Sequence, residues 1–333
     1  MQSSEENIEK KWLGHFSDIH AIVGLCLVAV FLFGIIGLVS SKKTDRPSLM
    51  ADVPVYYPAT PPEAEPAPHD DTKTPAPDAV PEPAPEQNAP QPKQLANSSP
   101  AFISLLGDAP LEDTYYLAKS NGPRDFYGGR WAPENIETTA DGTTFTVKKE
   151  DNPDVPFSIA EASTYKRYGY GRYEAIMQIG KGSGLVSAFF TYTGPYFGDP
   201  HDEVDIEFLG KDTTKIHFNY WRNGKRGKFA TFDLPFDASE GPHLYAFEWL
   251  PDRITWYVDG VPFYASDLND PSIPKTAGKM HFSHWTGIPQ MRDWHGKPGF
   301  GDEAVTTVSC ASFTPMGEDK RSCSDVYKEK KNS

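Results

Sequence analysis

From Phe102 onward, short runs of the chain alternate apolar and polar residues, a period of two that is typical of half-buried β-strands. Turn residues separate many of these runs, and Asp259-Gly260 between two of them predicts a tight hairpin. We find no long amphipathic helical pattern after residue 100. Nine runs are predicted as strands: 143–148, 172–179, 185–191, 204–209, 215–221, 244–249, 254–258, 279–285 and 305–313. Many short strands within roughly 200 residues indicate an all-β domain of two packed sheets.

One of these runs contains an unusual set of charges. In the segment His201-Asp202-Glu203-Val204-Asp205-Ile206-Glu207-Phe208, three carboxylates occupy alternate positions. On a strand, Glu203, Asp205 and Glu207 would share one face at spacings of roughly 7 Å, with apolar residues on the other face. Like charges at that spacing repel, and no Lys or Arg lies between them. The pattern indicates chemistry that needs carboxylates in different protonation states, and a solvated acidic strand face is the plainer alternative.

Strand parity extends this face to other runs. If the three acids point outward, the next predicted strand places a second set beside them: His217, Asn219 and Trp221. The run near the end of the domain adds a third set to the same face: His281, Ser283 and Trp285. This parity buries His284, an awkward position for a histidine, so the register of that run stays open.

An apolar segment near the N-terminus predicts a membrane anchor. Residues 21–39 carry no charge, and a helix of that length spans about 28 Å, close to the ~30 Å core of a bilayer. A cleaved signal peptide would have a shorter apolar region, of ~7–15 residues, and a small-residue cleavage site. We therefore predict an uncleaved single-pass anchor after a short N-terminal segment, residues 1–20. Its flanking Lys and Arg residues weakly favour a cytoplasmic C-terminal side.

Composition divides the rest of the chain. Residues 51–100 hold 14 prolines and lack hydrophobic periodicity, so we predict a disordered, semi-rigid linker over residues 40–100, with a docking site for a partner as the alternative. The folded domain is predicted over residues 101–315, and a polar tail follows over residues 316–333. The net charge of −14 and the lack of a basic patch argue against nucleic acid as a partner.

The three cysteines offer one pairing. Cys26 lies within the apolar segment, whereas Cys310 and Cys323 could form a disulfide if their part of the chain is extracytoplasmic. No pair of cysteines has the spacing of a zinc site.

Several motifs resemble glycoside hydrolase family 16, the jelly-roll β-glucanases. The sequence Glu-Val-Asp-Ile-Glu-Phe-Leu-Gly from Glu203 resembles the active-site strand of the family. The continuation to Trp221, the upstream Phe-Phe-Thr-Tyr-Thr-Gly-Pro and the downstream Trp-Tyr-Val-Asp-Gly are most similar to its lichenase (β-1,3-1,4-glucanase) branch. The resemblance spans about residues 125–315 and implies a two-sheet, concanavalin-like β-jelly-roll sandwich with a curved, concave cleft.

The resemblance also assigns roles. It makes Glu203 the nucleophile, Glu207 the general acid/base, and Asp205 the group that holds the nucleophile and helps to set both pKa values. Retention of configuration needs two carboxyl groups about 5–5.5 Å apart. Positions i and i+4 of a straight strand lie about 13 Å apart at Cα, so retention follows from the resemblance rather than from the spacing. Eight positions match substrate contacts, although the aromatic ones could belong to the core: Glu161, Phe190, Tyr192, His201, Asn219, Trp221, Ser283 and Trp285.

Some positions depart from the lichenase pattern. Ser163 stands where the family typically has Arg, two residues after Glu161; His201 stands where Trp is expected, and Ser283 where Asn is expected. A structural calcium is common in the family, but Ser309 replaces one of its carboxylate ligands, so we predict no metal and no cofactor. The lichenase disulfide has no counterpart. These changes favour an endogenous exopolysaccharide over mixed-linkage cereal glucan.

The sequence thus predicts a membrane-anchored, retaining endo-β-glycanase that hydrolyses internal β-1,3/1,4-type linkages of a polysaccharide. Because such a substrate lies outside the cell, we place the C-terminal domain in the periplasm, tethered to a bacterial inner membrane through residues 21–39. A transglycosylase, in which a sugar hydroxyl replaces water, is an open alternative because it uses the same three acids. The third alternative, a catalytically silent carbohydrate-binding module, is disfavoured because Glu203 and Glu207 are both present.

Overall fold

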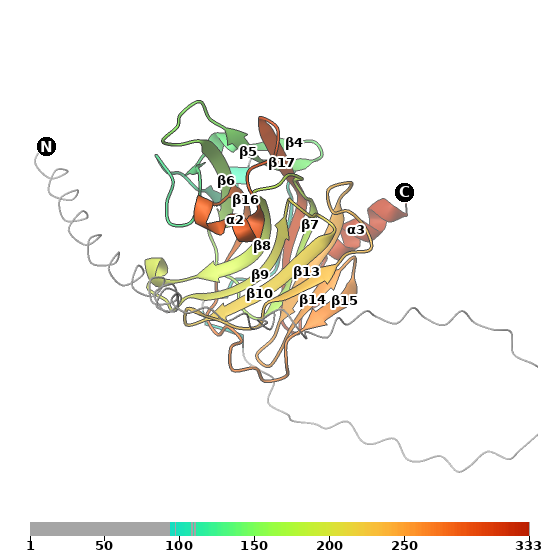
Figure 1. Cartoon of the computed structure of the whole chain (residues 1–333). Coiled ribbons are helices and arrows are strands. Elements are labelled where there is room, and N and C mark those ends of the chain that lie inside the picture. The colour runs from blue at the N-terminus through green and yellow to red at the C-terminus, as the bar shows by residue number, and fades with distance from the viewer. Residues whose placement is uncertain (1–93, 97, 108, 110, 333) are drawn as a thin grey trace, which may run out of the picture. The chain divides into compact units, whose positions relative to one another are not determined.

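The computed structural model describes residues 94–96, 98–107, 109 and 111–332 (Figure 1). The predicted anchor, residues 21–39, and most of the predicted linker lie outside these residues. Within the described part of the chain, no helix is both long and apolar enough to cross a membrane. Described residues that precede the predicted domain start at 101 already contact the domain, because the Ser98 hydroxyl accepts a hydrogen bond from the Gly169 N–H and the Ser99 N–H donates to the Arg167 carbonyl.

The described strands pair into two sheets, antiparallel except where β3 meets β6. In the first sheet the order is β4–β5–β17–β7–β13–β14–β15, with β1 also beside β17. Its strands are β1 (Phe102–Leu105), β4 (Ile136–Thr139), β5 (Gly142–Lys149), β7 (Gly171–Gln178), β13 (His243–Trp249), β14 (Ile254–Val258), β15 (Val261–Ala265) and β17 (Glu303–Pro315).

In the second sheet the order is β2–β6–β16–β8–β9–β10, and β10 continues to β11 and β12. Its strands are β2 (Tyr115–Leu117), β6 (Phe157–Thr164), β8 (Leu185–Thr193), β9 (Asp202–Leu209), β10 (Lys215–Arg222), β11 (Lys225–Arg226), β12 (Ala230–Asp233) and β16 (Lys279–Thr286). The short β3 (Arg130–Trp131) pairs with β6, which also pairs with β5 of the first sheet.

All nine predicted runs overlap observed strands, and the predicted hairpin turn joins β14 to β15 through Asp259 and Gly260, both with positive φ. This confirms the all-β, antiparallel fold expected of a jelly roll. Several strands were missed, and β6 is the most important of these because it carries Glu161. Its residues are buried on both faces over most of its length, so they show no apolar-polar alternation.

Aromatic rings fill the space between the sheets. Ring pairs join the two layers directly, with centroid distances between 4.8 and 5.5 Å: Phe189 with Phe247, Phe208 with Tyr245, and Phe218 with Trp256. Each of these side chains is fully buried. Such contacts fix the two layers face to face, so that one face of the second sheet is turned away from the core and toward solvent.

The register of β16 agrees with the predicted parity, and His284 is fully buried on the core face. Its Nδ1 lies 3.0 Å from the Ser187 hydroxyl, which in turn lies 2.8 Å from the hydroxyl of Thr306. A small polar network in the core therefore accommodates the histidine that made this register doubtful.

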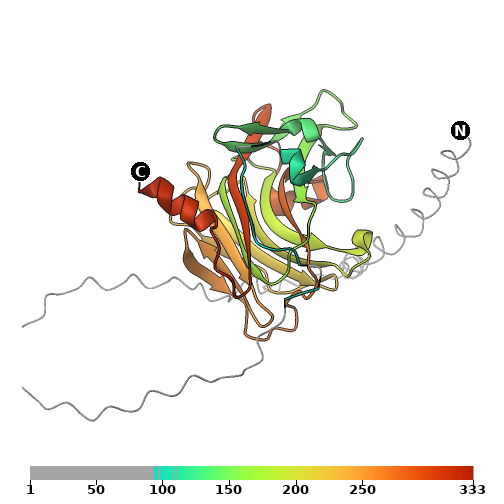
Figure 2. The ribbon, with the colours of Figure 1, turned by 180° about the vertical axis from the view of Figure 1, so that it is seen from behind.

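Beyond the predicted domain end, the polar tail forms a helix, α3 (Cys323–Lys331), which packs on the outer face of β7, β13 and β17 (Figure 2). The other described helical segments are short: α2 (Arg292–His295) and the 3-10 turns η1 (Leu111–Asp113), η2 (Pro133–Asn135), η3 (Pro195–Phe197) and η4 (Pro289–Met291). Three features hold α3 in place. Its Cys323 forms a disulfide with Cys310 of β17, Ser322 and Asp325 make a capping box, and Val326 and Tyr327 join a small cluster with Ile176.

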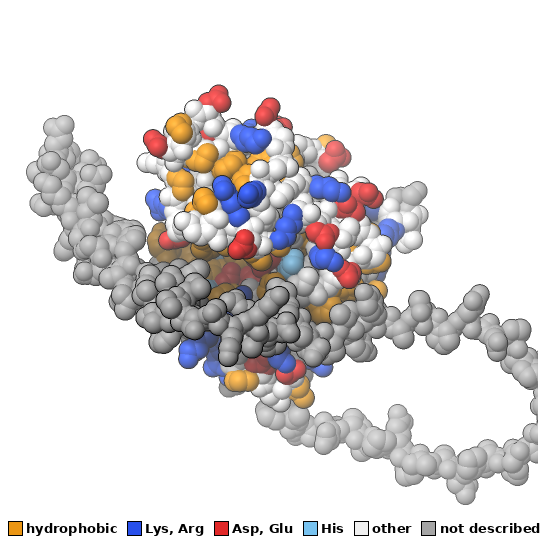
Figure 3. Space-filling model, in the orientation of Figure 1, with side chains coloured by type: hydrophobic (Ala, Val, Ile, Leu, Met, Phe, Trp, Pro, Cys, Tyr) orange, Lys and Arg blue, Asp and Glu red, His pale blue; other side chains and the backbone are white. Residues whose placement is uncertain are grey.

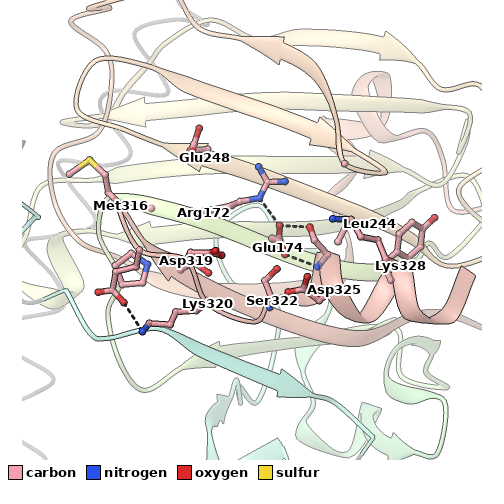
Figure 4. A pocket seen from close by; sticks show the side chains of 18 of the residues that line it. Arg172, Glu174, Leu244, Glu248, Met316, Asp319, Lys320, Ser322, Asp325 and Lys328 are labelled. Carbon is pink, nitrogen blue, oxygen red and sulfur yellow. Dashed lines mark hydrogen bonds and ion pairs between the residues drawn. The ribbon is translucent and has the colours of Figure 1, made fainter. Parts of the chain in front are cut away.

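Beside α3 the outer face of β7 and β13 is hollowed by a pocket of about 610 Å³ (Figure 4). At its base, the buried Glu174 carboxylate accepts hydrogen bonds from Arg172 Nε at 2.5 Å and from the backbone and hydroxyl of Ser324 at 2.8 and 2.6 Å. These bonds lower the pKa of Glu174 against the opposing effect of burial. Because the carboxylate is fully paired, Glu174 anchors the start of α3 to β7.

The disulfide gives the first testable prediction. Replacing Cys323 with Ser should lower the free energy of unfolding by about 2–4 kcal/mol, because the cross-link that restrains the unfolded chain is lost. Denaturant unfolding followed by circular dichroism measures this. A reducing agent should bring the wild-type midpoint down to that of C323S and leave the variant unchanged. Equal midpoints for the two proteins without reductant would show that the cross-link does not restrain the fold.

Candidate active site

The solvent-facing side of the second sheet arranges the predicted site residues in rows that cross the strands. Paired positions on β16, β8, β9 and β10 define each row. The row of Glu203 contains Lys279, Tyr192, Glu203 and Trp221. The row of Asp205 contains His281, Phe190, Asp205 and Asn219. The row of Glu207 contains Ser283, Ala188, Glu207 and His217, and Glu161 of β6 lies opposite Ser283. The predicted common face is therefore confirmed, and Figure 3 shows acidic and histidine side chains in a recess on this side.

Asp202, the fourth acid of the segment, has a different environment. It lies on the opposite parity and is buried, and its two carboxylate oxygens accept hydrogen bonds from the N–H groups of Asn223 and Lys275 at 2.9 and 2.8 Å. These bonds tie the start of β9 to two neighbouring loops. Asp202 is therefore a structural residue that helps to fix the position of the acid-bearing strand.

Glu203 is held by a histidine. Its Oε2 lies 2.5 Å from His201 Nε2, and because a carboxylate only accepts, the imidazole is the donor. The His201 ring stacks on Trp221 with centroids 5.2 Å apart, and Tyr192 meets it edge-on at 5.3 Å. A donated hydrogen bond favours the charged form of Glu203, and the flanking rings fix the orientation of the donor.

Asp205 is buried between its two acidic neighbours. Burial raises its pKa well above the usual range, and the charges of Glu203 and Glu207, together with a hydrogen bond to Glu203, raise it further. The strand is fixed from behind, because Trp256 Nε1 of the other sheet donates to the Asp205 carbonyl at 3.0 Å. Asp205 Oδ2 and the neighbouring Asn219 Oδ1 are buried without a hydrogen-bond partner. Burial and the two neighbouring carboxylates therefore both favour the protonated form of Asp205.

Glu207 is partly open to solvent but otherwise enclosed by protein. Burial, followed by the charge of Glu203, raises the pKa of Glu207 to about 8, and Arg226 opposes the shift. At neutral pH, Glu207 therefore keeps its proton while the hydrogen bond from His201 favours an ionised Glu203. Two carboxyl groups in unequal protonation states on one face can act as an acid and a nucleophile.

Trp285 lies in a different environment from the other predicted contacts. Its side chain is 5% exposed and packs against Phe126, Tyr127 and Trp294 at centroid distances of 5.6, 5.0 and 6.0 Å. It contributes to an aromatic cluster at one end of the face and offers little free ring surface. Strand parity predicted the correct face for Trp285. It could not predict that Phe126 and Tyr127 cover the ring, because these two residues come from a loop.

Two residues of this site, Tyr127 and Arg226, were not predicted from the sequence. Burial and the charges of Glu161 and Glu203 raise the pKa of Tyr127 well above its usual value, which places the phenol near both acids. Tyr127 reaches the sheet only through an isolated bridge to Gly287, so no strand pattern marked it. Arg226, the cation that acts on Glu207, lies on a two-residue strand that alternation cannot reveal.

The position expected to bind calcium does not fit a metal. Ser309 sits at a bulge of β17, and its carbonyl accepts a hydrogen bond from the Leu106 N–H at 3.2 Å. In the described part of the chain, no group of three or more His, Cys, Asp or Glu side chains is placed to hold a metal ion. Ser309 therefore does not supply a carboxylate ligand at the position where the family resemblance implies one.

A carboxyl group that keeps its proton, beside a second carboxylate that accepts a hydrogen bond, is the arrangement by which glycoside hydrolases cleave their substrates. The chain belongs to glycosyl hydrolases family 16, whose sequence model matches residues 124–307. It is therefore a glycoside hydrolase, as predicted.

Relatives and solved structures agree with this family. A β-glucanase of Paenibacillus macerans is 46% identical over 166 residues, which cover 50% of this chain and 68% of that protein. A β-glucanase of Bacillus subtilis is 42% identical over 53% of this chain and 70% of its own length. The structure of a lichenase from a mouse hindgut metagenome matches with a TM-score of 0.61 at 35% identity, covering 66% of this chain and all of that one. A Bacillus licheniformis β-glucanase gives 0.61 at 33% identity, covering 67% of this chain and 99% of that one.

The environment of Glu207 predicts how activity depends on pH. Activity should fall as the pH rises through about 8, because Glu207 then loses the proton it must deliver. Replacing Arg226 with Gln removes a cation that lowers the pKa of Glu207, so the pKa should rise and the alkaline limb of kcat/KM should move to higher pH. Near pH 7 the rate should change less than about two-fold, since Glu207 is already mostly protonated there.

The neighbouring Lys225→Gln is the matched control, because it removes the same charge from an adjacent exposed position that does not act on Glu207. An alkaline limb that moves to lower pH in R226Q, or that moves equally in K225Q, would contradict this assignment.

Proposed function

We propose that this chain is a retaining endo-β-1,3-1,4-glucanase that cleaves internal linkages of a polysaccharide. The observation that carries the proposal is the unequal state of two carboxyl groups on one strand face: Glu203 receives a hydrogen bond from His201, and Glu207 keeps a proton to about pH 8. The lichenase structure and the β-glucanases that are similar to this chain support the substrate class.

In the first step, Glu207 donates its proton to the glycosidic oxygen while a Glu203 oxygen attacks the anomeric carbon. The bond from that carbon to the leaving sugar breaks, a covalent glycosyl ester of Glu203 forms, and the leaving sugar departs with a new hydroxyl. In the second step, Glu207, now a carboxylate, takes a proton from water as the water oxygen attacks the same carbon. Glu203 is released, and two inversions give net retention.

Asp205 lies between the two reacting groups. Its raised pKa favours the neutral acid, which does not add a third negative charge to the site. When Glu203 becomes an ester, its charge disappears, and the pKa of Glu207 falls because that charge was one cause of its elevation. Glu207 can then remain ionised long enough to act as the base of the second step.

The rows that cross the strands supply binding surface for an extended chain of sugars. Trp221 and Tyr192 flank Glu203, and Phe190 lies opposite Asp205. Aromatic faces stack on the apolar faces of sugar rings, and the buried, unpartnered oxygens of Asp205 and Asn219 offer hydrogen bonds to sugar hydroxyls. A row of such groups on both sides of the acids favours cleavage within a polymer.

The acid roles give a direct test. In the full-length enzyme, Glu203→Ala and Glu207→Ala should each lower kcat on the polymer cleaved by wild type at least ~10³-fold, because each removes one half of the displacement. Lichenan, laminarin, xyloglucan and a succinoglycan-type polymer are the substrates, and products are resolved by size. Glu137→Ala, an exposed position on β4, is the control and should keep wild-type activity.

Azide distinguishes the two roles. With an activated aryl glycoside, azide should restore turnover of E203A and give the α-glycosyl azide, whereas E207A should give the β-glycosyl azide. Full activity of E203A would contradict the mechanism, and products longer than the starting oligosaccharide would identify a transglycosylase instead. Binding of the polymers without cleavage by wild type would favour a carbohydrate-binding module.

We further propose that residues 21–39 anchor the chain in a bacterial inner membrane, with the glucanase domain in the periplasm and an endogenous exopolysaccharide as its natural substrate. The uncharged apolar segment supports the anchor, and the Cys310–Cys323 disulfide fits an oxidising compartment. The departures from the lichenase pattern at Ser163, His201 and Ser283 support a polymer other than cereal glucan.

Membrane fractionation tests this location. The full-length chain, produced in a bacterial host, should stay in the membrane pellet after an alkaline carbonate wash, and protease added to spheroplasts should remove its domain. Deleting residues 21–39 should prevent recovery in the pellet. A domain that resists protease until the spheroplasts are lysed would place it in the cytoplasm and contradict the proposed orientation.

A further inference from the structure

One histidine of the cleft face has no role in the mechanism. His281 of β16 is 6% exposed, and both of its ring nitrogens are buried without a hydrogen-bond partner. Its Nδ1 lies 3.4 Å from Glu161 Oε1 on β6. The ring stacks on Phe190 with centroids 4.7 Å apart and planes 21° apart, and Tyr192 meets it edge-on at 6.0 Å. Phe190 and Tyr192 thus hold the ring in one orientation.

Unpartnered nitrogens are unusual in a buried imidazole, because a buried polar group without a hydrogen bond costs stability. Elsewhere in the described chain, His217 and His243 each pair through Nδ1, with Thr231 and Asp259. Both nitrogens of His295 are also unpartnered, but that ring lies in the aromatic cluster with Trp285 and Trp294. His281 occupies the cleft face beside Phe190, so a group that enters the cleft from solvent can supply the missing bond. Its position therefore fits a contact with substrate better than a role in the core.

Glu161 is the natural counterpart of His281. Ser163, the residue opposite His281 on β6, carries no charge. Burial raises the pKa of Tyr127 and of Tyr192, and the charge of Glu161 adds to both shifts, so the two phenols lie near this carboxylate. The Glu161 side chain is 18% exposed, so part of the carboxylate is open to solvent. An imidazole and a carboxylate side by side can bind two neighbouring hydroxyl groups, because the imidazole can hydrogen-bond to one hydroxyl and the carboxylate can accept a hydrogen bond from the other.

The pair lies away from the bond that is cleaved. β8 separates β16 from the acid-bearing β9, so His281 is two strand spacings, or ~10 Å, from Asp205 across the sheet. A sugar at this place belongs to the substrate chain but not to the reacting linkage.

We propose that His281 joins the sugar contact expected of Glu161, so that the two side chains form a specificity subsite for two adjacent hydroxyls of a neutral sugar ring remote from the cleaved linkage. The inference rests on the proposed glucanase function. Glu161 accepts a hydrogen bond from one hydroxyl, and His281 exchanges a hydrogen bond with the next.

A contact remote from the reacting bond is the same in the bound substrate and in the transition state. Its loss should therefore raise KM and leave kcat unchanged, and only substrates long enough to reach the subsite should be affected. A purely structural role for His281 would instead lower kcat on every substrate.

The experiment compares full-length wild type with His281→Leu and His281→Gln on a neutral β-1,3-1,4-glucan, on its longer oligosaccharides and on an aryl glucoside with one sugar unit. H281L should raise KM for the long substrates about ten-fold, with kcat within about two-fold of wild type, because one hydrogen bond is lost. H281Q keeps a hydrogen-bonding group and should recover most of the affinity. The aryl glucoside should be cleaved equally by all three proteins.

His243→Gln is the matched control, because it changes a histidine that also faces a carboxylate, Asp259, but lies on the other sheet. If H281L does not fold, as judged by thermal unfolding, His281→Phe replaces it and keeps the stack on Phe190. Equal KM values for wild type and the apolar variant on long substrates would overturn the inference alone. Failure of the wild type to cleave any β-glucan would overturn the proposed function and the subsite with it.

Discussion

Mutual repulsion among three carboxylates on one strand face is the constraint on which the site depends. Glu203, Asp205 and Glu207 alternate along β9, and Asp205 is almost fully buried between the others. Three charges cannot be kept there, so the proton affinities of Asp205 and Glu207 rise and the hydrogen bond from His201 favours charge on Glu203. Because the crowded acids repel one another, Glu207 keeps a proton that it can donate, and Glu203 is left as the nucleophile.

The rest of the fold holds that arrangement in place. Packing of β8, β9 and β10 on β13 and β14 through buried rings fixes which face of β9 meets solvent, and Trp256 bonds directly to the backbone of Asp205. A one-residue slip of β9 would turn the acids into the core, where nothing could neutralise them. The register of β9 is therefore fixed by two independent constraints: its apolar residues must face the core, and its acids must face solvent. The α3 helix and its disulfide act on the opposite face of the molecule and support the first sheet without contacting the acids.

Much of this could be predicted from the sequence, because alternation is a direct consequence of strand geometry. The acid-bearing strand, its partner β10 and the awkwardly buried His284 all followed from parity. Alternation is absent where a strand is buried on both faces, so β6 was not recognised. Strand parity also does not show which loops cover a face, so the packing of Phe126 and Tyr127 over Trp285 was not predicted. Contacts between strands distant in the chain, such as His281 with Glu161, depend on sheet order and could not be read from local pattern. The polarity of the tail gave no sign of α3, because a disulfide and a buried Glu174 secure it rather than a long apolar stripe.

The most direct test of the central claim is an NMR titration of the carboxyl carbons of Glu203 and Glu207, in wild type and in Glu203→Gln, with side-chain carboxyls labelled by ¹³C. The account predicts that the Glu207 carboxyl titrates near pH 8 in wild type and at lower pH in E203Q, because the neighbouring charge is gone. Titration of Glu207 near the ordinary glutamate pKa of ~4.3 in both proteins would contradict it. The two acids would then be equivalent, and the site would lack a proton donor at neutral pH.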